Sequence, residues 1–99
     1  MTAEERYESV CESLLQALRP RFGGQSNPLL VDKVRRLARE AIALGKTGYI
    51  KEKAGSMVGW VEIACSPRRH KPWGLERVEH FAYEDAYRLR YAFPDQQKD

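Results

Sequence analysis

The chain has 99 residues and a formal net charge of +3 at pH 7, with 42% hydrophobic and 31% charged residues. This length suits one domain with a modest core, and an aromatic content of 10% excludes a disordered composition. Two cysteines exclude a disulfide scaffold. The sequence shows no leader peptide and no apolar run long enough to span a membrane. We therefore expect one cytoplasmic domain over residues 1–99, with 94–99 as a frayed tail.

A first helix is predicted over residues 2–19. Thr2 and Glu5 form a capping box, in which each side chain accepts a hydrogen bond from the other residue's backbone N–H. Pro20 ends the helix, because its ring disfavours helical geometry at the preceding residue. Apolar residues recur at spacings of three and four and form one stripe, which comprises Tyr7, Val10, Cys11, Leu14, Leu15 and Leu18.

A second helix is predicted after a loop over residues 20–27. Asn27 occupies the N-cap position, Pro28 occupies the first helical position, and Gly45 is a C-terminal stop signal. The opposite sides of this helix differ, since one is basic and the other apolar. The apolar side comprises Leu30, Val34, Leu37, Ala38, Ala41 and Leu44.

Residues 47–65 are compatible with two structures. Apolar residues alternate over 57–65, and Ala54-Gly55 can turn the chain back onto a strand over 49–53, which predicts a β-hairpin. Apolar residues between Ile50 and Val61 also recur at helical spacing. That helix would contain three glycines, each costing about 1 kcal/mol relative to Ala. We therefore predict the hairpin and keep the helix as the alternative.

A further helix is predicted over residues 75–93, after a proline-bounded loop over 66–73. Its apolar residues lie at helical spacing, Glu76 lies in its first turn, Arg88 and Arg90 lie near its end, and Pro94 follows. A hairpin here would lack the Gly or Asn that tight turns require. The predicted fold class is thus α+β and predominantly helical, in the order helix, helix, hairpin, helix. The alternative is an all-α domain of four helices.

Two groups of residues are predicted to bind a partner. The loop over 66–73 contains three cations and no acidic residue, and Arg and Trp are frequent at the centres of protein interfaces. Three tyrosines lie four residues apart on the last helix, away from its aliphatic stripe, so they form either a second buried side or a contact surface. The predicted partner-binding residues are Arg68, Arg69, His70, Lys71, Trp73, Tyr83, Tyr87 and Tyr91. A solvated loop and burial of the tyrosines against the protein's own helices are the alternative interpretations.

An alternative site follows from residues 37–50, which resemble a DNA-binding helix-turn-helix motif. Ala41 lies four residues before the turn residue Gly45, which lets two helices cross closely. Glu40 and Lys46 depart from the motif, because they stand where it usually has apolar residues. An ordinary helix followed by a glycine turn is the other interpretation. The predicted nucleic-acid surface comprises Arg35, Arg36, Arg39, Lys46, Lys51 and Lys53.

No constellation of catalytic side chains stands out in the sequence, so we predict a protein that is not an enzyme. We predict no metal site and no cofactor, because the histidines and cysteines lack diagnostic spacing. The favoured function is a non-catalytic accessory module, an adaptor, subunit or inhibitor that binds a larger protein assembly, with assemblies that handle nucleic acid included. Direct DNA or RNA binding is the alternative function, and homodimerisation through the tyrosines is a further expectation, without membrane association.

Overall fold

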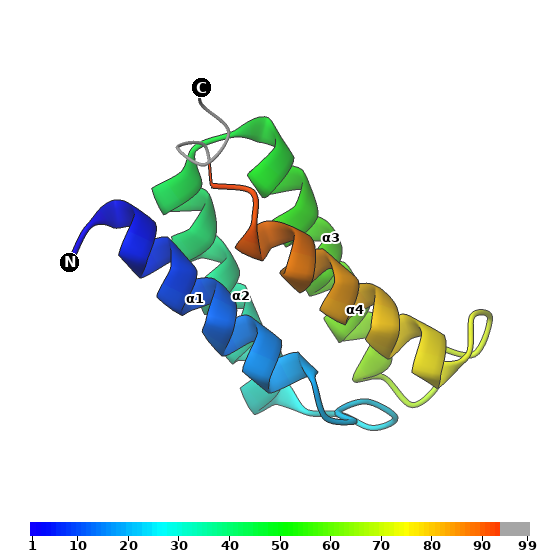
Figure 1. Cartoon of the computed structure of the whole chain (residues 1–99). Coiled ribbons are helices and arrows are strands. Elements are labelled where there is room, and N and C mark those ends of the chain that lie inside the picture. Colours follow the sequence, from blue (N-terminus) through cyan, green and yellow to red (C-terminus); the bar gives the residue numbers. More distant parts are fainter. Residues whose placement is uncertain (94–99) are drawn as a thin grey trace.

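The computed structural model describes residues 1–93. The described residues contain four helices and no strand: α1 (Ala3–Leu18), α2 (Pro28–Gly45), α3 (Gly48–Ala64) and α4 (Leu75–Arg90). Each helix packs against the next one along the chain, and α4 also packs against α1, so the four form a closed bundle (Figure 1). The bundle measures 44 × 23 × 19 Å. The predicted tail over 94–99 lies outside the described residues.

The predicted hairpin over 47–65 is wrong, because α3 runs through this whole segment. The α+β fold class is therefore corrected to an all-helical domain, the arrangement kept as the alternative. Thr47 starts α3 by accepting a hydrogen bond from the backbone N–H of Ile50 at 3.1 Å. The buried side of α3 follows helical spacing and comprises Ile50, Ala54, Met57, Val61 and Ala64.

Tertiary packing outweighs the local preferences that favoured a strand. A Cβ atom built on Gly55 or Gly59 would meet nothing within 4 Å, so these glycines contribute no packing and only weaken the helix. Val61, by contrast, is fully buried in the core. Burial of such side chains is worth about 1.5–3 kcal/mol each, which exceeds the cost of a glycine.

The predicted helix boundaries are confirmed for α1, α2 and α4 to within a few residues. Thr2 and Glu5 form the predicted capping box, and Asn27 caps α2 through its side chain. The predicted stop signal at Gly45 needs a correction. Lys46 adopts the left-handed conformation, with φ of 61°, whereas Gly45 lies within α2 against Ile50, whose side chain leaves no space for a Cβ atom there.

The contact between α1 and α4 combines buried and charged groups. The hydroxyl of Tyr7 donates a hydrogen bond of 2.6 Å to the carbonyl oxygen of Leu89 within the core. At the surface, Arg90 donates hydrogen bonds to Glu8 at 2.7 Å and to Glu12 at 2.8 Å. The end of α4 thus contacts the first half of α1 through Tyr7 and Glu8, whereas Glu79, near the start of α4, binds Phe22 in the chain that follows α1, so the two helices run antiparallel.

Glu79 of α4 binds the connection between α1 and α2 through hydrogen bonds. Its carboxylate accepts hydrogen bonds from the backbone N–H groups of Phe22 at 2.9 Å and Gly23 at 2.7 Å, and from the guanidinium of Arg21. Burial alone would raise the pKa of Glu79, but these hydrogen bonds and the charge of Arg21 outweigh it and lower the pKa. Glu79 is therefore a buried, ionised anchor.

Both cysteines are free and buried in the bundle. Burial raises the pKa of Cys11 to about 11, although a hydrogen bond with Tyr7 opposes the shift. Burial, followed by the negative charge of Glu79, raises the pKa of Cys65 as well, which disfavours a reactive thiolate there. No helix within residues 1–93 is long and apolar enough to cross a membrane.

Candidate functional site

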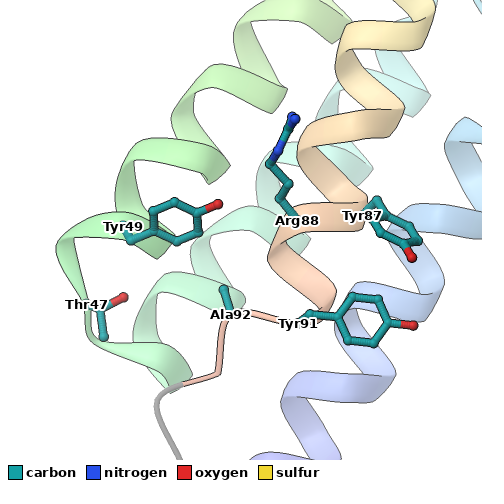
Figure 2. Close-up of a pocket in the computed structure, with 6 residues that line it drawn as sticks. All are labelled: Thr47, Tyr49, Tyr87, Arg88, Tyr91 and Ala92. Carbon is teal, nitrogen blue, oxygen red and sulfur yellow. The ribbon is translucent and has the colours of Figure 1, made fainter. Parts of the chain in front are cut away.

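A groove with a volume of about 570 Å³ lies between the N-terminal end of α3 and the C-terminal end of α4. Figure 2 shows Tyr49 on one side of this groove, Tyr87 and Tyr91 on the other, and Arg88 between them. We call it the tyrosine groove. Its lining comprises Thr47, Tyr49, Tyr87, Arg88, Tyr91 and Ala92.

The three tyrosine rings are largely exposed. Tyr87 is 53% exposed, Tyr91 57% and Tyr49 46%. The rings of Tyr87 and Tyr91 pack on each other with their centroids 5.2 Å apart. Since the rings form a small apolar cluster that the bundle leaves uncovered, a partner can bury this surface without rearranging the core.

Positive charges border the tyrosine groove. The ammonium of Lys53 lies 5.6 Å from the centre of the Tyr49 ring, and the guanidinium of Arg90 lies 5.0 Å from that of Tyr91. Arg88 reaches Glu84 at 3.5 Å, although both side chains remain more than 40% exposed. Among the described residues, no carboxylate lines the groove. The groove therefore offers aromatic rings and a guanidinium donor.

The predicted tyrosine stripe divides into two parts. Tyr87 and Tyr91 line the tyrosine groove, whereas Tyr83 is half-buried and packs against the core. Tyr83 also borders a separate hollow of about 260 Å³ beside Pro20 and Glu79. The prediction of one continuous surface thus combined one side chain that packs inward with two that lie exposed.

The predicted basic loop lies at the opposite end of the α3–α4 pair from the tyrosine groove (Figure 1). Arg68, Arg69 and Lys71 are exposed and form no ion pair within the described residues. Trp73 is 41% exposed, and its ring meets that of Trp60 nearly at a right angle, with centroids 5.3 Å apart. Half-buried His70 has its Nδ1 atom buried without a hydrogen-bond partner in residues 1–93.

The structure scatters the residues of the alternative nucleic-acid surface. Arg35 donates a 3.0 Å hydrogen bond to Glu62 of α3, and Lys53 lies over the ring of Tyr49. Arg36 and Lys51 are exposed on different helices, Arg39 borders a hollow between α2 and α3, and Lys46 is the left-handed residue between these helices.

The α2–α3 connection does not have the crossed geometry of a helix-turn-helix motif. The bond from Arg35 to Glu62 joins the first half of α2 to the last turns of α3. The two helices therefore run side by side and antiparallel along most of their length (Figure 1), whereas the motif crosses its helices at about 90–120°. Residues 37–50 form part of a helical hairpin.

The roles of two groove residues and the burial of one carboxylate were not predicted from the sequence. The sequence pattern placed Tyr49 only in the predicted strand over 49–53 or the helix-turn-helix-like segment over 37–50, and Arg88 only among the charges near a helix end. Asp85 carried no local signal, yet it is 6% exposed and its Oδ2 atom has no hydrogen-bond partner in the described part of the chain. A tyrosine at the start of one helix and two at the end of the next, antiparallel helix give the signal that could have found the groove.

Comparison with known proteins gave no matching family model, no similar curated protein and no similar solved structure. Among residues 1–93, no group of three or more His, Cys, Asp or Glu side chains is placed to hold a metal ion. The fold and its surface define a small helical bundle with an exposed aromatic groove at one end and a basic loop at the other.

Proposed function

We propose that this protein is a non-catalytic docking module that binds a partner protein through the tyrosine groove. Tyrosine is enriched in protein interfaces, because its ring supplies a large contact area at a small cost in conformational entropy. The observation that carries the proposal is the exposure of Tyr49, Tyr87 and Tyr91 around one groove. An adaptor, subunit or inhibitor of a larger assembly acts in this way.

The chemistry of the groove indicates what the partner presents. The rings of Tyr87 and Tyr91 suit an apolar or aromatic side chain, which would be removed from water on binding. The guanidinium of Arg88 suits a carboxylate or carbonyl oxygen next to it, because arginine is a donor without acceptor capacity. The occupant is therefore a protein segment with an apolar anchor flanked by an acidic residue.

Co-purification from cells of the source organism tests this function. We expect the double variant Tyr87→Ala/Tyr91→Ala to lose its protein partners, because removing interface anchors costs about 2 kcal/mol or more each, or about thirtyfold in affinity. Nuclease treatment of the lysate should not release the partners of the native chain. Circular dichroism of the double variant confirms that the bundle stays folded.

The matched control is Leu29→Ala, which removes an exposed apolar side chain from the start of α2, where Leu29 is 84% exposed. It should keep every partner of the native chain. If the native chain and the double variant recovered the same amounts of the partner proteins, docking through the groove would be refuted. Recovery of the chain itself as the specific partner would redirect the proposal to a homodimer.

A further inference from the structure

We propose that the loop over 66–73 is a second binding site, independent of the tyrosine groove, and that it takes single-stranded nucleic acid. Three observations support it: the positive charge of the loop, the exposed surface of Trp73, and the backbone hydrogen bonds that fix the cations relative to Trp73. This site goes beyond the proposed docking function, since it lies at the other end of the α3–α4 pair.

The loop concentrates positive charge without local compensation. Arg68, Arg69 and Lys71 fall within four residues, and no acidic residue occurs between Ser66 and Gly74. All three side chains are exposed and free of ion pairs within the described part of the chain. Exposed cations without carboxylate partners are available for phosphate oxygens, and binding there releases counterions from the nucleic acid.

Trp73 supplies a ring on which a base can stack. Its plane stands at 88° to that of Trp60, so Trp60 can cover at most one face of the Trp73 ring. Trp60 is itself held by Phe81, with ring centroids 4.9 Å apart. Trp73 therefore packs on a fixed aromatic side chain, while 41% of its own surface stays exposed. Base stacking on such a ring is independent of sequence, because every base has a π-face.

The backbone holds the cations and the ring in a fixed relation. The N–H of Lys71 donates to the carbonyl of Arg68 at 3.1 Å, and the N–H of Trp73 donates to the carbonyl of His70 at 3.1 Å. The hydroxyl of Ser66 accepts a hydrogen bond of 3.3 Å from the N–H of Arg69. An ordered loop loses little conformational entropy when it binds, which favours affinity.

Single strands fit this arrangement better than duplexes or acidic proteins do. In a duplex the bases are stacked on one another and unavailable to Trp73, whereas a single strand offers both its phosphates and its base faces. An acidic peptide would satisfy the cations but would leave the indole without a stacking partner. The neighbouring placement of three cations and one half-exposed indole therefore favours a single strand.

Fluorescence anisotropy with a labelled oligothymidylate of about fifteen nucleotides tests the proposal. We expect binding at low salt, with log affinity falling at a slope of about −2 against log salt, as three phosphate contacts at about −0.7 each predict. The triple variant Arg68→Gln/Arg69→Gln/Lys71→Gln should weaken binding by about tenfold or more. The control variant Lys33→Gln/Arg36→Gln/Arg39→Gln removes the same charge from α2 and should bind like the native chain.

Stacking has its own measurement, because Trp60 and Trp73 are the two tryptophans of the chain. In the variant Trp60→Phe the emission comes from Trp73 alone, and the oligonucleotide should quench it. The variant Trp73→Leu keeps an apolar side chain against Trp60 but should bind about fivefold or more weakly. Circular dichroism verifies that each variant is folded.

Three results would overturn the proposal. The native chain would not bind the oligonucleotide at low salt, the α2 control would lose as much affinity as the loop variant, or the emission of Trp73 would stay unchanged at saturating oligonucleotide. A duplex of the same sequence that binds as tightly as the single strand would also exclude stacking. Tighter binding of an oligoglutamate peptide of equal charge would assign the loop to an acidic protein instead.

Discussion

At the scale of single residues, Glu79 decides whether the α1–α2 connection stays attached to α4. Two backbone N–H groups and the side chain of Arg21 donate hydrogen bonds to it, and a buried N–H left without an acceptor costs about 1–3 kcal/mol. The sequence did not predict this role of Glu79, because its partners lie more than 50 positions away along the chain. Such a role depends on tertiary contacts alone.

Replacing Glu79 with Gln should lower the free energy of unfolding at pH 7 by about 1–3 kcal/mol, since one charged acceptor is lost. The folded-state pKa of Glu79 lies below its ordinary value of 4.5. Its contribution is therefore complete above about pH 4.5 and is lost as the pH falls through the folded-state pKa. Urea unfolding between pH 3 and 7 should show the difference between native chain and variant shrinking in acid.

The matched control for this prediction is Glu76→Gln. Glu76 reaches the same Arg21 at 3.8 Å, but its side chain is 86% exposed. A pair so exposed contributes little to stability, so this variant should unfold like the native chain. If the difference in free energy of unfolding between the native chain and Glu79→Gln stayed constant down to pH 3, Glu79 would not be an ionised anchor.

At the scale of elements, local signals predicted three of the four helices. The capping box at Thr2, the Asn27-Pro28 start of α2 and the charge distribution along α4 are all readable within a few residues. Helix α3 was predicted wrongly because its glycines and β-branched residues disfavour a helix locally. Its helical structure comes from side chains that pack against both neighbouring helices, and a short sequence window does not show this.

The glycines of α3 give a test at this scale. Gly55→Ala and Gly59→Ala should each raise the free energy of unfolding by about 0.5–1 kcal/mol, because the added methyl group meets nothing and restrains the unfolded chain. Gly23→Ala should instead lower it by about 1–3 kcal/mol, since its Cβ would lie 2.7 Å from the carbonyl oxygen of Ala64. Thermal and urea unfolding of the three variants measures both the expected stabilisation and the expected destabilisation.

Destabilisation by Gly55→Ala or Gly59→Ala would contradict a well-formed α3. It would mean that these positions need a conformation that Ala avoids. A neutral Gly23→Ala would mean that the α1–α2 connection can move away from the end of α3.

At the scale of the whole molecule, the two candidate surfaces lie at opposite ends of one helical pair. The 16 residues of α4 separate them by about 24 Å, at 1.5 Å per residue. A ligand on the basic loop and a partner in the tyrosine groove could thus bind at the same time. The sequence predicted the basic loop and the tyrosine stripe as two groups, but it did not show that they lie at opposite ends of the helical pair, because the direction of each helix was unknown.

The composition of the groove was partly predictable. Tyr87 and Tyr91 were recognised from their four-residue spacing, yet which tyrosine of the stripe packs inward depends on the placement of α1. Tyr49 joins them only because α3 and α4 run antiparallel, which brings the start of one helix to the end of the other. Recognition of the groove therefore required α3, a helix that the sequence predicted only as the alternative to a hairpin.

Site-specific photocrosslinking in cells shows directly whether the tyrosine groove contacts a partner protein. A benzophenone amino acid replaces Tyr87 in one variant and Leu29 in the other, and both are irradiated in cells of the source organism. We expect a discrete crosslinked protein from position 87 that is absent from position 29 and disappears when Tyr49 and Tyr91 are changed to Ala. The same products from both positions, or none from position 87, would contradict it.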